Sequence, residues 1–317
     1  MTTPNRPMKA IVYEKYGSHR ELKIQEMDIP KPKAGEALVE IKGSSVNPVD
    51  WKIRRGNLKP ISGFRFPKQA GSDFSGIVRA SNIAHYQHGD EVYGMINPVK
   101  GGAHAEFAIV KNHEMGRKPK NMPFHEAAAL PLAGLTALQT MKYKGKIQKG
   151  HSVLINACCG GVGHFAVQYC KAQSASVTGI CSTNKIDQAK KLGADKVIDY
   201  KKEDVFEIPG TYDIILDPIG NINFKRMKSK LNKNGVMIAF RPLPENILAW
   251  IYTIFTSQKL KFYLTRVNPK DLKELATLVE DQKIRPFIHE VFDLEHTSDA
   301  YQIAEEGHLV GKVAIKI

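Results

Sequence analysis

Asn156-Ala-Cys-Cys-Gly-Gly-Val-Gly-His-Phe165 is the stretch of this sequence that decides its fold. An apolar run typical of a buried strand precedes it (residues 152–157), and a helical pattern follows from about residue 162 to 173. Glycines at such a turn let phosphates approach the backbone, where free N–H groups and the helix dipole favour an anion. The two cysteines and the histidine are also potential metal ligands. A turn that binds phosphate and a site that binds a metal ion would belong to different classes of protein.

The spacing favours the phosphate turn. Structural zinc sites use Cys and His pairs separated by a few residues, and no second pair lies near Cys158 and Cys159. We therefore expect no metal and interpret both cysteines as small apolar fillers, and His164 as a first-turn helix residue facing solvent or a cofactor. Whether either thiol is reactive stays open, because a thiol at a helix start can have a lowered pKa.

Small residues at the turn match a dinucleotide-binding motif. Ala157 takes the first small position, which departs from the commonest form, and Gly160 and Gly163 take the next two. Gly161 is an additional glycine beside Val162. The strand before the turn and the helix after it make this match much more specific than the glycines alone.

Strands and helices alternate around this turn. Strands are expected at residues 152–157, 176–181, 196–200, 212–217 and 235–240, with helices at 162–173, 185–192 and 224–231. Repeated β-α-β units with apolar strands predict an α/β fold with a doubly wound parallel sheet covered on both faces.

The first third of the chain has a different texture. Short apolar or alternating runs are separated by Gly, Pro and Asn turns, at residues 9–13, 37–44, 74–80, 91–96 and 104–110. This pattern predicts a β-barrel-like domain. After residue 270 the expected elements are helices at 271–281 and 298–306 and strands at 287–292 and 312–317, which could return to the first domain.

Composition excludes several classes of protein. The chain has 317 residues, 42% of them apolar and 25% charged, which is ordinary for a globular protein of two domains. Its net charge of +14 comes from scattered lysines without a basic-aromatic array, so no nucleic-acid partner is expected. No run is long enough to span a bilayer, the start lacks a signal core, and the four cysteines show no disulfide framework, so a reduced, cytoplasmic protein is predicted.

The end of the second strand of the parallel sheet bears on the choice of cofactor. NAD-binding sites place an acidic residue there, but this chain has Ser182, Thr183, Asn184 and Lys185. Their hydroxyl, amide and ammonium groups suit a phosphate, and Tyr200 could cover the adenine-ribose side. NADPH is therefore predicted, although the segment is also an ordinary helix cap.

Several ordered motifs then show a resemblance that covers nearly the whole chain. They include Ser45-Val-Asn-Pro-Val-Asp-Trp-Lys-Ile-Arg-Arg-Gly56, Ala70-Gly-Ser-Asp-Phe-Ser-Gly76, Pro131-Leu-Ala-Gly-Leu-Thr-Ala137, Leu192-Gly-Ala-Asp-Lys-Val-Ile-Asp-Tyr200 and Gly311-Lys-Val-Ala-Ile315. Together with the glycine turn, they resemble the zinc-independent medium-chain dehydrogenases/reductases of the quinone oxidoreductase (zeta-crystallin-like) type.

The resemblance implies a fold and partners. A GroES-like catalytic domain (residues 1–122 and 268–317) would surround a Rossmann domain (residues 123–267), with NADPH bound and a homodimer formed. Zinc-dependent relatives carry a cysteine at the position of Asn47 and Gly-His-Glu at Gly71-Ser-Asp73. They also carry a four-cysteine structural lobe that this sequence lacks, so both the catalytic and the structural zinc site are expected to be absent.

The resemblance also implies an activity, which is NADPH-dependent hydride transfer to quinones or to α,β-unsaturated carbonyl compounds. Asn47 and Lys52 are the candidates for contacting the substrate oxygen, whose negative charge grows in the transition state. Lys52 stands where relatives often have tyrosine, and its head could equally reach water. Thr136 and Phe240 are candidate neighbours of the cofactor.

Two alternatives remain: a non-catalytic NADPH-binding sensor or adaptor, and a zinc-type alcohol dehydrogenase. The apolar segment Ile247-Leu-Ala-Trp-Ile-Tyr-Thr-Ile-Phe255 is expected to form a buried helix, at a dimer interface or as a lid element. A membrane-facing patch is the less favoured interpretation of that segment.

Overall fold

The computed structural model describes residues 6–241 and 243–317. The chain divides into two compact units. The first unit comprises Met1–Leu135, Val267–Asp281 and Pro286–Ile317, and the second comprises Thr136–Arg266 and Gln282–Arg285.

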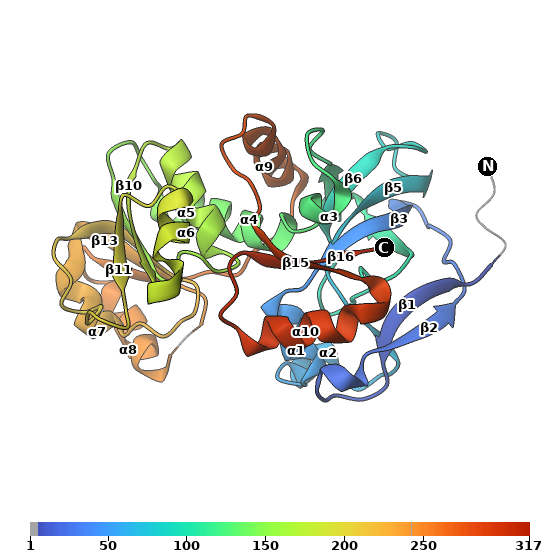
Figure 1. Ribbon diagram of the computed structural model, residues 1–317, viewed down its shortest axis with the longest axis horizontal. Helices are drawn as coiled ribbons and strands as arrows, with labels where there is room; N and C mark the ends of the chain where they lie inside the picture. Colours follow the sequence, from blue (N-terminus) through green and yellow to red (C-terminus); the bar gives the residue numbers. More distant parts are fainter. Residues whose placement is uncertain (1–5, 242) are drawn as a thin grey trace. The chain divides into compact units, whose positions relative to one another are not determined.

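The second unit is built on a six-stranded parallel sheet of order β11-β10-β9-β12-β13-β14. Its strands are β9 (Ser152–Ile155), β10 (Ser176–Cys181), β11 (Lys196–Asp199), β12 (Tyr212–Asp217), β13 (Leu231–Ala239) and β14 (Lys259–Phe262). Its helices are α5 (Gly163–Ala172), α6 (Ile186–Lys191), α7 (Phe224–Met227) and α8 (Pro244–Thr253). Helix α5 packs on β9 and β10, and α8 packs on α7 and β14 (Figure 1). The strand order, reversing beside β9, is that of a Rossmann domain.

The first unit consists mainly of antiparallel strands. One sheet has the order β2-β1-β4 and the other the order β15-β16-β3-β5-β6-β8, with β7 also paired to β3. The strands are β1 (Met8–Tyr13), β2 (Lys23–Met27), β3 (Glu36–Ser45), β4 (Lys68–Gln69), β5 (Asp73–Ser81), β6 (Glu91–Met95), β7 (Phe107–Lys111), β8 (Met115–Arg117), β15 (Ile288–Asp293) and β16 (Lys312–Lys316). The helices of this unit are α1 (Pro48–Arg54), α2 (Lys59–Ser62), α3 (Phe124–Ala127), α9 (Pro269–Glu280) and α10 (Thr297–Glu306). Helix α4 (Pro131–Gln139) begins in this unit and ends in the second. This is the expected GroES-like architecture, and C-terminal β16 pairs with N-terminal β3, so the chain's end does return to the first unit.

The turn between β9 and α5 brings two backbone segments into close contact. A Cβ atom on Gly163 would lie 2.1 Å from the carbonyl oxygen of Ala157 and 2.8 Å from Cα of Cys158. Only glycine fits there, so the predicted role of Gly163 in close helix–strand packing is confirmed. Ala157 itself has a φ of 49°, in the left-handed region.

Helix α8 differs from the expectation of a buried helix. Only one stripe of it is covered, where Ala249 and Thr253 are buried. Leu248, Trp250 and Phe255, in contrast, are 72%, 44% and 85% exposed, so most of the segment is not buried within this chain, and its place at a dimer interface or as a lid stays a prediction. No helix of the described part of the chain is both long and apolar enough to cross a membrane.

The left-handed conformation of Ala157 makes a prediction about stability. Substituting Ala157→Gly should stabilise the protein by about 1 kcal/mol, because glycine adopts this conformation without the clash that a Cβ atom causes. Chemical denaturation followed by circular dichroism measures the difference. The matched control is Ala166→Gly inside α5, which should destabilise the protein by about 1 kcal/mol or more. A loss of stability in Ala157→Gly would contradict the prediction.

Candidate functional site

The turn of the second unit exposes its backbone. The amide N–H of Gly160 donates to the carbonyl of Ala157 over 2.9 Å, which closes the turn, while Gly160, Gly161 and Val162 remain partly exposed. Asn156 fixes the strand end, since its amide donates to Asp217 and to the side-chain carbonyl of Asn221, each over 2.8 Å. The predicted phosphate-binding residues therefore form one accessible turn at the carboxyl ends of the strands.

The segment after β10 lies at the same edge of the sheet. Ser182 donates to the side chain of Asn184 over 2.6 Å, and Lys185 is partly exposed. Thr183 donates over 2.6 Å to Asp199, a buried carboxylate at the end of β11. This hydrogen bond lowers the pKa of Asp199. An acidic residue thus does lie at this edge, contributed by the third strand of the motif.

The other predicted cofactor residues of the second unit differ in exposure. Tyr200 is 43% exposed directly after β11, and Phe240 is partly buried at the end of β13. Thr136 is 6% exposed, and its hydroxyl is hydrogen-bonded to that of Thr265. Tyr200 is thus available to a ligand, whereas the hydroxyl of Thr136 already has a partner within the unit.

A buried charged cluster occupies the first unit. Asn47 is 1% exposed, and its amide donates to Asp73 over 2.9 Å. The Lys312 ammonium donates to the side-chain carbonyl of Asn47 and, over 2.8 Å, to the carbonyl of Val46, and it lies 3.9 Å from the Asp73 carboxylate. Burial raises the pKa of Asp73 and lowers that of Lys312, while each group's charge opposes the other's shift. A single lysine therefore neutralises the carboxylate and orients the amide.

Helix α1 starts on this cluster. The backbone N–H of Asn47 donates to Asp50 over 2.9 Å, and Ser72 donates to the same carboxylate over 2.8 Å. Burial raises the pKa of Asp50 to about 7, against the effect of these hydrogen bonds. The cluster thus fixes the first turn of α1, and Lys52, exposed in its middle, is carried on a rigid base.

His104 is a second buried polar group of the first unit. Its Nδ1 lies 2.8 Å from the hydroxyl of Ser44, and its Nε2 lies 3.1 Å from that of Tyr301. Burial lowers the pKa of His104 to about 3, and the nearby Lys312 charge adds to this effect. His104 is therefore a neutral histidine at physiological pH.

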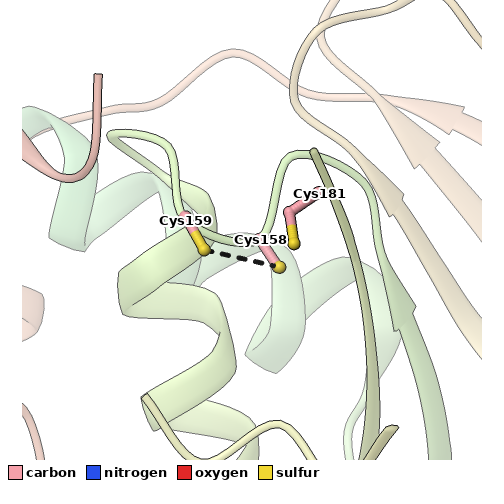
Figure 2. Close-up of side chains that lie close together, drawn as sticks. All are labelled: Cys158, Cys159 and Cys181. Carbon is pink, nitrogen blue, oxygen red and sulfur yellow. Dashed lines mark hydrogen bonds between the residues drawn. The ribbon is translucent and has the colours of Figure 1, made fainter. Parts of the chain in front are cut away.

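Three thiols meet beneath the phosphate turn. Cys158 and Cys159 lie on the turn and Cys181 ends β10, and the three sulfur atoms face one another (Figure 2). All three residues are buried. His164 is buried too, and its Nδ1 lies 2.9 Å from the carbonyl oxygen of Gly160, so it does not face solvent.

Sequence reasoning missed the residues that hold these sites in place. Lys312 and Asp73 stand inside quoted motifs, and the signal that could have identified them is a charged residue at the start of an otherwise apolar strand. Cys181 and Asp199 end neighbouring parallel strands, and such ends meet at one edge of a sheet.

The low pKa of His104 predicts how stability changes in acid. Because the folded state favours neutral His104, its contribution is complete above about pH 6.5, the unfolded value, and is lost as the pH falls toward 3. His104→Gln should lower stability at pH 7 but flatten the fall between pH 6.5 and 3 by about 1.4 kcal/mol per pH unit. Urea denaturation across this range measures the slope. The exposed His88→Gln variant is the control, and equal slopes for wild type and His104→Gln would refute the assignment.

Two family models match the chain. One is described as an alcohol dehydrogenase GroES-like domain and matches residues 33–120, and the other as a zinc-binding dehydrogenase and matches residues 192–315. The first of these models confirms the expected GroES-like domain.

Curated relatives and a solved structure match over nearly the full length. A chloroplast envelope quinone oxidoreductase homolog of Arabidopsis thaliana is 32% identical, with 98% of each chain covered. A chloroplastic NADPH-dependent alkenal/one oxidoreductase of the same plant is 31% identical, with 98% of this chain and 80% of the relative covered. The quinone oxidoreductase from Coxiella burnetii has a TM-score of 0.91 at 28% identity, with 98% of this chain and 100% of that chain covered. The chain therefore belongs to the medium-chain dehydrogenase/reductase superfamily, among its quinone oxidoreductase-type members.

Proposed function

We propose that this protein is a zinc-independent NADPH-dependent reductase of quinones or α,β-unsaturated carbonyl compounds. The observation that carries the proposal is the turn at residues 157–163, where only glycine fits at Gly163 and the backbone of Gly160–Val162 is accessible. Such a turn fits the pyrophosphate of a dinucleotide. Relatives named as quinone and alkenal/one oxidoreductases support the substrate class.

The choice of NADPH over NADH rests on the segment after β10. Ser182, Asn184 and Lys185 supply hydroxyl, amide and ammonium groups for a ribose phosphate. Asp199 opposes this choice, because a carboxylate repels a phosphate. The Asp199 carboxylate, however, already accepts hydrogen bonds from the Thr183 hydroxyl and from the backbone N–H of Lys201, over 2.6 and 3.0 Å. Lys185 is therefore the proposed source of selectivity.

Zinc independence is supported by the cluster around Lys312. The resemblance places a cysteine of the zinc-dependent relatives at Asn47 and their Gly-His-Glu at Gly71-Ser-Asp73. Here the Lys312 ammonium donates to Asn47 and lies 3.9 Å from Asp73. A cation of the chain itself therefore balances the carboxylate that zinc would otherwise meet. A second cation beside it would be strongly repelled in this buried setting.

The exposure of each side chain indicates its proposed role in the reaction. Bound NADPH supplies the hydride. The exposed ammonium of Lys52 is proposed to donate to the substrate oxygen, which stabilises the negative charge that develops there. Asn47, buried and held by Asp73 and Lys312, is proposed to act by positioning the start of α1. Thr136 and Phe240 stay proposed neighbours of the cofactor, and solvent is the proposed proton source.

Turnover with a panel of substrates tests this proposal. Oxidation of NADPH, followed by its absorbance, is expected with quinones and with enals or enones, and chelator treatment should leave it unchanged. Lys52→Met should lower kcat by about a hundredfold, as for loss of one oxyanion donor, whereas the exposed Lys120→Met should have no effect. Tight NADPH binding without turnover would identify a sensor or adaptor instead. Activity that depends on added zinc would identify an alcohol dehydrogenase of the zinc type.

A charge reversal tests the cofactor. Lys185→Glu should weaken NADPH binding by tenfold or more, on the order of one lost charge pair, and should change NADH binding little. Isothermal titration calorimetry with both cofactors gives the ratio, and Lys190→Glu on the exposed face of α6 is the control. An equal loss for NADPH and NADH would remove Lys185 from the phosphate site.

The predicted homodimer and cytoplasmic location stay predictions. The names of several relatives place them in chloroplasts or in mitochondria, so the compartment of this chain does not follow from them.

A further inference from the structure

Cys158, Cys159 and Cys181 form a compact triangle of sulfur atoms. The Sγ atoms of Cys158 and Cys159 are 3.9 Å apart, and all three Sγ atoms lie within 4.8 Å of one another (Figure 2). Two come from the turn and one from the end of β10. The backbone N–H of Cys158 donates over 3.1 Å to the carbonyl of Ile180, so the sheet fixes their spacing.

These separations match those of three thiolates around one metal ion. A thiolate sulfur lies about 2.3 Å from a bound d¹⁰ metal ion. Three sulfurs at that distance from a central ion in their own plane are about 4.0 Å apart, by the geometry of the triangle. The Cys158–Cys159 separation of 3.9 Å already has this value, so coordination requires only small movements.

We propose that Cys158, Cys159 and Cys181 form a site for one soft monovalent metal ion of the copper(I) type, bound by three sulfurs. This departs from the expectation of no metal, because spacing along the chain did not show that Cys181 joins the two cysteines of the turn.

The ligand set favours copper(I) over zinc. Within the described residues, no fourth cysteine, histidine or carboxylate atom joins the group. Zinc in structural sites takes four ligands, whereas soft thiolates select copper(I), which is satisfied by three. All three residues are buried, 0%, 1% and 3% exposed, so water is a poor fourth ligand.

The neighbouring strand β10 leaves space for the sulfur of Cys158. A Cβ atom at Gly179 would lie 2.6 Å from that sulfur, so glycine at this position lets the triangle form.

Metal binding has a consequence that rests on the proposed NADPH function. Coordination of one monovalent ion by three thiolates, with release of the thiol protons, leaves a complex of charge −2, which is more negative than the thiols it replaces. That charge lies directly beneath the turn proposed to hold the pyrophosphate and next to Lys185, whose carbonyl accepts from Cys159 over 3.6 Å. Bound copper(I) should therefore weaken NADPH binding.

Anaerobic titration of the reduced full-length protein with copper(I), in competition with a chromophoric copper(I) chelator, tests the site. Wild type should bind about one ion per chain, with a thiolate-to-copper charge-transfer band in the near ultraviolet. X-ray absorption should show three sulfur neighbours. Cys158→Ser and Cys181→Ser should each lose this binding, while Cys170→Ser, a buried cysteine of α5 outside the triangle, should keep it.

Several outcomes would overturn the site: no copper(I) retained against the chelator, equal loss in Cys170→Ser, or stoichiometric tetrahedral zinc in place of copper(I). Circular dichroism verifies folding, and Cys159→Ser is a further variant if either of the others fails to fold. In a parallel titration, NADPH affinity should fall by about tenfold on copper loading. Lack of NADPH binding by metal-free protein would sink the proposed function and leave the metal site standing.

Discussion

The close approach of Gly163 to the carbonyl of Ala157 is the constraint on which the second unit depends. With 2.1 Å between that oxygen and any added Cβ atom, α5 can start directly over the end of β9 only if residue 163 lacks a side chain. The turn that follows β9 stays partly exposed at Gly160, Gly161 and Val162, where an anion could approach the backbone. Ala157 in the same turn has a left-handed conformation, so the turn carries a small strain beside its proposed ligand.

The first unit depends in the same way on one buried cation. Lys312 starts β16 and reaches Asn47 and Val46, which end the loop before α1, and it balances Asp73 on β5. An isolated charge at 3% exposure would be costly, so the three elements hold each other in register through the ion pair and its hydrogen bonds. This cluster holds the first turn of α1, and α1 carries Lys52, the proposed substrate-binding residue.

Local sequence patterns predicted the positions of strands and helices well, but they predicted the burial of these elements less well. The strands at Ser176–Cys181 and Tyr212–Asp217 have the bounds that their apolar runs indicate. Helix α8 was predicted from the same kind of signal, but burial depends on what packs against a helix, and α8 is covered on one stripe only. Helix α1 was not anticipated, although Asn47 as N-cap, Pro48 in the first turn and Asp50 three residues after the cap are helix-start signals that the sequence contains.

The sequence by itself determined a β-rich first part, a parallel α/β sheet and the glycine turn between a strand and a helix, because these follow from short-range periodicity and from glycines at fixed spacing. Only the tertiary structure decided which distant side chains meet. Cys181 joins Cys158 and Cys159, and Lys312 joins Asn47 and Asp73, across separations of more than twenty and more than two hundred residues. Sheet pairing brings such residues together, and pairing between strands far apart in the chain leaves no periodic trace in either segment.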